Sequence, residues 1–239
     1  MTTATAPTHG RASRLALTVL CVALSSAAFA AEDDDGAWLI VSTTDAFKAD
    51  TGDSRWHYSF DAQARYFNLG SGINQYLLRP GIGWQVSSNV RVWAGYARIR
   101  SRNSIGNTVD EDRFWQQLDW RAGSWNGGTL TMRARLEQRS LSAGDDVGLV
   151  LRFQTKYVRP VGERGKTKLV LGIEPFVDLR NTDWGGDSGL GQNRSFIGFD
   201  WRVSNRLSLE AGYMHQYIWV DSGSDRVNHL GVLNFKVRL

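Results

Sequence analysis

The feature of this sequence that most constrains its fold is an alternation of apolar and polar residues that recurs along the chain. Between Trp56 and Tyr66 every second residue is apolar, and the residues between them are His, Ser, Asp, Gln and Arg. Because residues i and i+2 share one face of a β-strand, this period predicts a strand with an apolar face. The same test predicts strands at 37–44, 56–67, 74–86, 90–100, 113–122, 129–140, 147–158, 168–180, 193–203, 207–219 and 228–239.

Two kinds of β-protein produce this alternation, a soluble sandwich and a membrane barrel. Most of the predicted strands span about ten to thirteen residues, longer than the usual strands of globular sheets and close to what a tilted strand needs to cross a bilayer. Connections alternate between tight turns such as Ser87–Asn89 and longer loops such as Ser101–Asp112 and Asn181–Gly191. Short turns at one rim and longer loops at the other predict an all-β fold, a transmembrane antiparallel up-and-down β-barrel.

The number of predicted strands conflicts with the even strand numbers of bacterial single-chain barrels. The segment 37–44, AWLIVSTT, has the weakest alternation. Either this segment lies outside the sheet, which leaves ten strands, or the chain before it also pairs, which makes twelve. We therefore expect a closed sheet of 10–12 strands, because an open edge in hydrocarbon leaves backbone groups unpaired at a cost of several kcal/mol each.

One hairpin pattern occurs twice, as WQVSSNVRVWAGY at 84–96 and WRVSNRLSLEAGY at 201–213. Each copy has a Trp before the turn and a Tyr on the same outward face of the returning strand. The pattern predicts four membrane-interface aromatics near opposite headgroup zones, Trp84, Tyr96, Trp201 and Tyr213. Gly95 and Gly212 are expected to point inward and to leave room for a neighbouring arginine. A purely structural origin stays open, because any antiparallel meander repeats its turns.

The first thirty residues have the order of an export signal. Arg11 and Arg14 precede the apolar stretch Leu15–Leu24, and Ala28-Phe29-Ala30 is a small-x-small cleavage motif. We expect cleavage before Ala31, so that residues 1–30 are a signal peptide and residues 31–239 form a single barrel domain. The sequence thus predicts export to the cell outer membrane.

Composition excludes several functional classes. The formal net charge of +4 falls to about +2 once the two signal arginines are removed, too little for a nucleic-acid-binding surface. The single cysteine, Cys21, lies in the signal, so the mature chain has no disulfide. No Cys or His cluster has metal-ligand spacing, and the acidic run Glu32–Asp35 is expected to be a solvated tail. We predict no metal, no cofactor and no nucleic-acid partner; the pattern leaves the oligomeric state open.

Five motifs resemble a known family. QYLLRPGIGW, RFWQQLDW, RARLEQR, QNRSFIG and EAGYMHQY appear in the order and approximate spacing of bacterial proteins grouped as domain of unknown function 2490. The resemblance runs from about Trp38 to Leu239 and implies an outer-membrane barrel without an established activity. It also implies the barrel assembly machinery as a partner during biogenesis. The chain departs from the usual pattern of that machinery's substrates, because it ends in Leu239 rather than an aromatic residue; Phe235 is the nearest substitute.

Charged residues on the inward faces predict the contents of the lumen. The alternation places the following charge network inside: Arg79, Arg133, Arg135, Glu137, Arg139, Arg152, Lys156, Glu174, Asp178, Arg194, Asp200 and Glu210. Arginine forks paired with carboxylates form charge-assisted hydrogen bonds and can fill a barrel of this size. The main prediction is therefore a structural barrel with a largely filled lumen. The alternative is a narrow anion-preferring pore, since fixed positive charge lowers the entry cost of an anion.

Enzymatic activity is the least favoured prediction, as a lipid hydrolase or acyltransferase. His57 and Ser59 share a strand face roughly 7 Å apart, beyond hydrogen-bond reach. His215 is expected to face outward, and His229 lies near the rim of longer loops without a fixed serine beside it. We predict no catalytic residues and no enzyme.

The expected partners are outer-membrane lipid and lipopolysaccharide. Acidic residues in the longer loops could bridge to lipopolysaccharide through divalent cations: Asp110, Glu111, Asp112, Asp145, Asp146, Asp183, Asp187, Asp221 and Asp225.

Overall fold

The computed structural model describes residues 31–239 except 50–51, 70, 73, 163–164 and 222. The predicted signal peptide, residues 1–30, lies outside the described residues, and residues 31–239 form one compact unit. Its strands are β1 (Glu32–Ala49), β2 (Gly52–Phe67), β3 (Asn74–Gln85), β4 (Val90–Arg102), β5 (Thr108–Trp125), β6 (Gly128–Leu141), β7 (Val147–Val161), β8 (Thr167–Asp178), β9 (Gly189–Arg202), β10 (Leu207–Ile218) and β11 (Arg226–Val237). The strands coincide with the predicted segments at their centres, but β1, β2, β5 and β9 begin four or five residues earlier than predicted.

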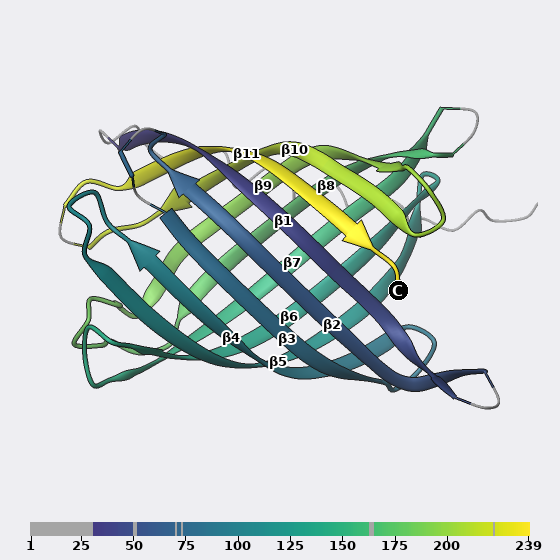
Figure 1. Cartoon of the computed structure of the whole chain (residues 1–239), viewed down its shortest axis with the longest axis horizontal. Helices are drawn as coiled ribbons and strands as arrows, with labels where there is room; N and C mark the ends of the chain where they lie inside the picture. Colours follow the sequence, from purple (N-terminus) through teal and green to yellow (C-terminus); the bar gives the residue numbers. More distant parts are fainter. Residues whose placement is uncertain (1–30, 50–51, 70, 73, 163–164, 222) are drawn as a thin grey trace, which may run out of the picture. The chain divides into compact units, whose positions relative to one another are not determined.

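These strands form a closed, mostly antiparallel barrel, which confirms the predicted all-β barrel (Figure 1). Every strand is antiparallel to its neighbours in sequence. The barrel closes between β1 and β11, which are parallel and paired from Glu32 opposite Arg226 to Thr43 opposite Val237. Among the described residues, no helix is long and apolar enough to span a membrane.

The expectation of ten or twelve strands is wrong, because the described barrel has eleven. The first and last strands of an odd meander run in the same direction, so closure requires one parallel pair. The segment 37–44, which has the weakest alternation, lies within β1, and β1 hydrogen-bonds to both β2 and β11. The acidic run Glu32–Asp35 begins this strand rather than forming a tail.

Because the number of strands is odd, the sheet begins with β1 at one rim of the barrel and ends with β11 at the opposite rim. At one end, here called the turn rim, β1 is connected to β2, β3 to β4 (86–89), β5 to β6 (126–127), β7 to β8 and β9 to β10 (203–206), and β11 ends there. At the other end, the loop rim, β2 is connected to β3, β4 to β5 (103–107), β6 to β7 (142–146), β8 to β9 (179–188) and β10 to β11, and β1 begins there. The loops are shorter than predicted at 101–112 and 181–191, because β5 already begins at Thr108 and β9 at Gly189.

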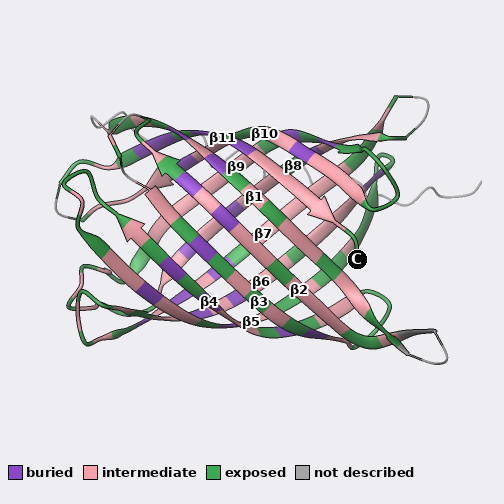
Figure 2. Cartoon of the chain, in the orientation of Figure 1, coloured by how far each residue is buried: buried purple, intermediate pink, exposed green. Residues whose placement is uncertain are grey.

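The outer face of the barrel is apolar and exposed. Exposed and buried residues alternate along the strands (Figure 2), and the large apolar side chains include Leu78, Phe114 and Ile197 at 52%, 61% and 52% exposure. Most of the buried side chains lie in the half nearer the loop rim. The chain therefore buries polar groups inside and exposes apolar groups outside, the reverse of a soluble protein.

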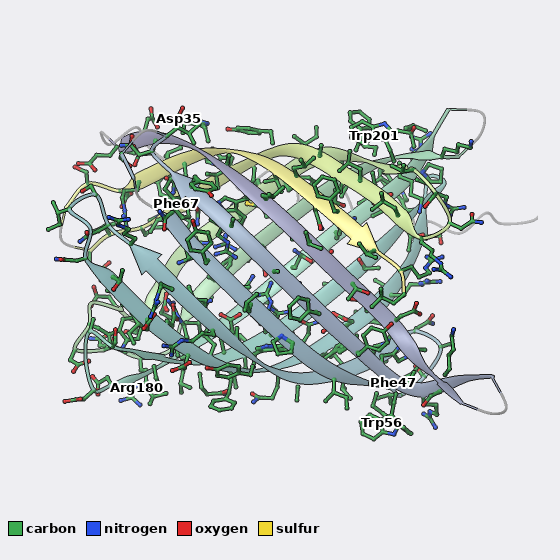
Figure 3. All side chains as sticks on the ribbon, in the orientation of Figure 1. Asp35, Phe47, Trp56, Phe67, Arg180 and Trp201 are labelled. Carbon is green, nitrogen blue, oxygen red and sulfur yellow. The ribbon has the colours of Figure 1, made fainter. Side chains whose placement is uncertain are left out.

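Outward aromatic residues form two rows. Trp56 and Trp201 project from the barrel near the turn rim (Figure 3), and Trp56 packs edge-on against Trp84 with ring centroids 4.8 Å apart. Tyr66 and Tyr76 are exposed near the loop-rim ends of β2 and β3.

Tyr96 packs against Phe114 at a centroid distance of 5.5 Å and lies at the middle of β4, as Tyr213 lies near the middle of β10. Each repeated hairpin thus contributes a Trp near the turn rim, whereas its Tyr lies between the two rows.

The inward glycines make room for aromatic rings. A Cβ built on Gly95 would meet the ring of Trp115, and one on Gly212 would meet the Phe196 ring and the backbone of β9. The expectation that these glycines leave room for an arginine is therefore wrong. The glycines allow bulky rings to lie flat against the inner wall.

Candidate functional site

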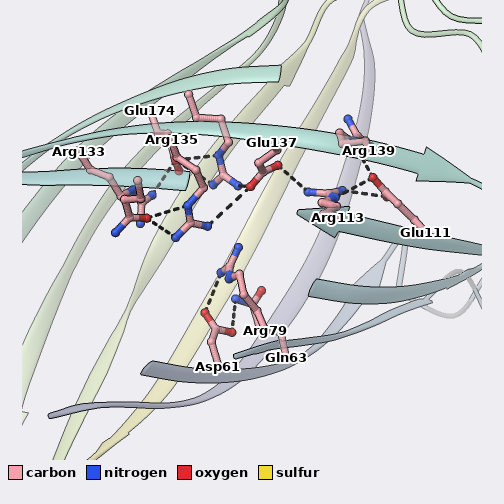
Figure 4. Close-up of polar contacts among 12 residues, drawn as sticks. Asp61, Gln63, Arg79, Glu111, Arg113, Arg133, Arg135, Glu137, Arg139 and Glu174 are labelled. Atoms are coloured by element: carbon pink, nitrogen blue, oxygen red, sulfur yellow. Dashed lines mark hydrogen bonds and ion pairs between the residues drawn. The ribbon is translucent and has the colours of Figure 1, made fainter. Parts of the chain in front are cut away.

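The centre of the lumen holds an alternating chain of four arginines and three glutamates (Figure 4). In order it runs Arg139, Glu111, Arg113, Glu137, Arg152, Glu174 and Arg133, and we call it the Arg–Glu chain. It is built from β5, β6, β7 and β8, whose inward positions face one another across short distances. Each glutamate is shared by at least two arginines, so every carboxylate is paired and the chain has one more arginine than glutamate.

Glu137 lies at the middle of this chain and is 1% exposed. It accepts from Arg152 Nη1 at 2.6 Å and from Arg113 Nη1 at 3.0 Å, which ties β6 to both of its neighbours. Glu174 on β8 accepts from Arg152 Nη2 at 2.8 Å and from Arg133 Nη2 at 2.7 Å. Buried ion pairs of this kind require full partnering, because a lone buried charge costs several kcal/mol.

Glu111 and Arg113 were missed by the sequence analysis as members of the lumen. Glu111 was expected to be a loop acid, but it is 5% exposed and accepts from Arg113 Nε at 2.7 Å and Arg139 Nε at 2.5 Å. The cause is the early start of β5, since an inward position was counted as loop. Continuing the alternation from Trp115 and Gln117 back through Arg113 would have placed Glu111 inside.

A second charged group lies on β2 and β3. Asp61 and Arg79 are opposite each other in the strand register and form an ion pair of 2.7 Å. Gln63 donates to Asp61 at 2.7 Å, and Arg65 donates to Gln63 at 2.7 Å and to Gln75 at 2.6 Å. Asp61 and Arg65 were on the inward face of the predicted strand, but only Arg79 was assigned to the charge network.

A third charged group joins strands that are not neighbours. Glu210 on β10 accepts from Lys156 on β7 at 3.1 Å and from Lys236 on β11 at 2.5 Å. Lys236 also donates to Asp200 on β9 at 2.9 Å. The two lysine side chains are 30% and 32% exposed, so water reaches this group more easily than the Arg–Glu chain.

Three inward arginines lie against aromatic rings rather than hydrogen-bonding to a carboxylate. Trp38 lies between Arg65 and Arg194, whose guanidinium carbons are 4.2 and 4.8 Å from its ring centroid. Arg135 lies 4.6 Å from the Trp115 ring and 3.7 Å from Glu137. Cation–π contacts of this kind stabilise a guanidinium where water is scarce.

The inward tryptophans Trp38, Trp93 and Trp115 are also new relative to the sequence analysis, which placed tryptophan at the membrane interface. Trp93 donates its Nε1–H to Asp119 at 2.8 Å. All three are buried and occupy inward positions of β1, β4 and β5. Their positions on the inward face of the period-two pattern would have identified them as interior residues.

The predicted charge network therefore lies inside the barrel, with uneven pairing. Arg79, Arg133, Arg135, Glu137, Arg139, Arg152, Glu174, Asp200 and Glu210 take part in ion pairs among the described residues. Asp178 and Arg194 lie on inward positions, but no ion pair joins either of them to another residue in the described part of the chain. The side-chain amide of Gln192 faces the Arg194 guanidinium.

A cavity of about 460 Å³ occupies the lumen towards the turn rim. It extends from Ser88 and Asn89 in the turn 86–89 to Trp115 and Arg135 near the middle of the barrel. A second cavity of about 350 Å³ lies at the same rim, lined by Lys168, Arg202, Arg206, Lys236 and Arg238 among others. The lumen is thus packed around the Arg–Glu chain and hollow near the turn rim.

The loop rim carries the acidic residues singled out in the sequence. Asp110 and Asp112 lie on β5 and pair with Arg98 at 3.0 and 2.7 Å. Asp183 accepts the backbone N–H of Asp145 at 2.8 Å, which together with the N–H of Asp146 lowers the pKa of Asp183. No group of three or more His, Cys, Asp or Glu in the described part of the chain is arranged to hold a metal ion.

Two of the histidines, His215 and His229, form an outward cluster. His229 accepts or donates at Nδ1 with the Tyr213 hydroxyl, 2.5 Å away, and its ring packs edge-on against His215 at 5.8 Å. This cluster is on the outer face, and its nearest carboxylate is Asp33, 3.8 Å from His229 Nε2.

The comparison with family models matches the barrel. Residues 35–228 match the model described as protein of unknown function, domain of unknown function 2490. The chain belongs to this family. It is also similar to an uncharacterized protein of Methylorubrum extorquens, with 33% identity over 229 residues that cover 95% of this chain and 99% of the relative. No solved structure matches.

The family match covers the functional candidate as well as the fold. It contains β2 to β10 in full and the whole Arg–Glu chain. The matched domain is therefore the barrel together with its charged interior.

Proposed function

We propose that this protein is an outer-membrane barrel whose lumen is closed by its own ion-pair network. It is a structural barrel without enzymatic activity, exported through a cleaved signal peptide at residues 1–30. Its partners are outer-membrane lipid, lipopolysaccharide and, during biogenesis, the barrel assembly machinery. The observation that carries the proposal is the inversion of polarity, with charged residues buried inside and apolar residues exposed outside.

The spacing of the aromatic rows supports a membrane location. Trp56 and Tyr66 are outward positions of β2, ten residues apart. At ~3.3 Å per residue and a strand tilt of roughly 40°, they are separated by roughly 25 Å along the barrel axis, the height of the apolar band in outer-membrane barrels. Rings at these two levels would sit in the headgroup zones of the two leaflets.

The Arg–Glu chain supports a closed lumen. Its glutamates are between 1% and 5% exposed, so water has little access to their carboxylates. An ion that crossed this level would have to break several charge-assisted hydrogen bonds, which are about twice as strong as neutral ones. The network therefore works against conduction.

Reconstitution into planar bilayers tests the closed state. The folded wild-type barrel is expected to give no stable channel openings, whereas a double variant Glu137→Ala, Arg152→Ala should open the constriction. Sustained anion-selective openings of the wild type would contradict the closed lumen and favour the narrow anion pore.

Membrane fractionation tests the location separately. The processed protein is expected in the outer-membrane fraction and to migrate differently on a gel before and after boiling. Recovery of the processed chain with periplasmic soluble proteins would contradict the proposal.

A further inference from the structure

The turn-rim cavity is lined by an excess of positive charge. Among the described residues its lining includes Arg79, Arg91, Arg121, Arg133 and Arg135, against Asp61 and Asp119. Asp61 forms an ion pair with Arg79. Asp119 accepts hydrogen bonds from Trp93 and Gln117. The carboxylates on the wall are therefore occupied, and a net positive surface faces the cavity.

Hydrogen-bond donors at the inner end of the cavity also outnumber acceptors. Arg135 is buried, and both its Nε and its Nη2 donate to the single amide oxygen of Gln117. Its Nη1 lies 3.7 Å from Glu137 Oε1 without forming a hydrogen bond. The Nε1 of Trp115 and the Nε of Arg133 also have no hydrogen-bond partner in the described part of the chain. Buried donors without acceptors cost about 1–3 kcal/mol each, so this end of the cavity favours an acceptor-rich ligand.

The arginines are held in place before any ligand arrives. Arg135 lies over Trp115 at 4.6 Å and Arg91 lies over Trp93 at 5.4 Å. Trp115 in turn lies against Gly81, where a built Cβ would be 2.5 Å from the indole Cη2. A guanidinium fixed on an indole loses little conformational freedom on binding and presents its planar edge to a carboxylate or phosphate.

We propose that the turn-rim cavity is a binding pocket for a small organic oxyanion, a carboxylate or a phosphate, with Arg135 as its principal contact and Arg91 as a second. The cavity volume of about 460 Å³ falls in the range of small-molecule sites. The Arg–Glu chain closes its inner end, so the ligand enters and leaves at the turn rim. This inference depends on the proposed function in one respect, that the Arg–Glu chain closes the lumen.

The second cavity at the same rim is the natural control. Its lysine Lys236 is already paired with Asp200 and Glu210, and Lys168 lies opposite Asp200 in the strand register. Its arginines Arg202, Arg206 and Arg238 form no ion pair among the described residues, so this cavity is also lined by positive charge. Unlike the first cavity, it has no arginine lying over an indole ring in the described part of the chain. An anion attracted only by the general charge of the rim would depend on both cavities equally.

Isothermal titration calorimetry on the full, detergent-folded protein at physiological ionic strength tests the pocket, with succinate and inorganic phosphate as separate probes. Choline and glycerol serve as cationic and neutral controls. Arg135→Gln should weaken binding about tenfold or more, because hydrogen bonds to charged groups are the strong ones. Arg91→Gln should weaken it severalfold, Asp119→Asn should strengthen it, and Lys168→Gln should leave it within about twofold.

Binding of succinate alone identifies the carboxylate source, and binding of phosphate alone identifies the phosphate source. Failure of both to saturate at high millimolar concentration overturns the proposal, as does equal weakening by Lys168→Gln and Arg91→Gln. Arg91→Gln keeps the test valid if Arg135→Gln does not fold, since Arg91 lies on the wall near the turn. Channel conductance measures the closure alone, so a conducting barrel that still binds the anion would refute the proposed function and not the pocket.

Discussion

The two halves of the lumen solve the problem of internal charge in different ways. Around the Arg–Glu chain each buried glutamate has at least two arginine partners, and the space between the strands is filled. Towards the turn rim Arg135 and Arg91 lie on indole rings and donate to the amides of Gln117 and Gln85, and a cavity remains. Charge on inward positions therefore does not by itself distinguish a structural network from a binding site. The distinction depends on whether each arginine is paired with a carboxylate or lies against an aromatic ring with hydrogen-bond donors to spare for a ligand.

The largest effect is expected when the packed half loses its central carboxylate. Glu137→Gln removes the charge shared by Arg113 and Arg152 and should lower the free energy of unfolding by about 3–5 kcal/mol, the usual cost of breaking a buried ion pair. Urea titration of the detergent-folded barrel measures it. Gln138→Ala, the next residue on the outward face, is the control and should cost less than about 1 kcal/mol. A Glu137→Gln cost no larger than the control would show that the network is not fully desolvated.

A smaller effect is expected at the Trp115 ring, which lies at the inner end of the turn-rim cavity. Gly81→Ala places a methyl group 2.5 Å from Trp115 and 2.9 Å from the Ser59 hydroxyl, so the ring must move. Overpacking of this kind costs about 1–3 kcal/mol. Gly172→Ala is the matched control, because its Cβ would meet nothing nearer than 3.8 Å. Equal unfolding midpoints for the two variants would mean that Trp115 is not fixed by its glycine neighbour.

The hollow half should tolerate the loss of a carboxylate better than the packed half. Glu210→Gln leaves Lys156 and Lys236 without their shared partner, but both lysines reach water. We expect a loss of about 1–2 kcal/mol in the same urea titration, below that of Glu137→Gln. A loss as large as at Glu137 would remove the contrast in hydration between the two halves.

The smallest effect is expected outside the spanning strands, at the loop rim. The pKa of Asp183 is lowered from its ordinary value of 3.8 by the backbone N–H groups of Asp145 and Asp146. A lowered folded-state pKa stabilises the loops above pH 3.8, and this stabilisation is lost as the pH falls through the lowered pKa. The protection factors of the Asp145 and Asp146 amides against hydrogen exchange should therefore fall on acidification, and in Asp183→Asn they should be low already at neutral pH. Unchanged exchange in the variant would show that these amides do not depend on the carboxylate.

The sequence by itself determined which segments are strands and which face of each strand is apolar. Trp56, Phe60 and Tyr66 are outward because a period of two leaves no other choice once one face meets an apolar surrounding. The same parity placed Arg79, Glu137 and Arg152 inside. Local periodicity survives in the fold because the strand period is a property of the backbone.

Only the tertiary structure decided how the barrel closes and how the interior charges divide. A strand does not encode its partner, so the parallel pairing of β1 with β11, which lets all eleven predicted segments join one closed sheet, appears only when the sheet is complete. The partners of Arg135 and Glu111 depend on register between different strands, which sets distances that periodicity does not contain. For the same reason the cavity at the turn rim follows from where inward rings such as Trp115 come to rest, and not from any one segment of the chain.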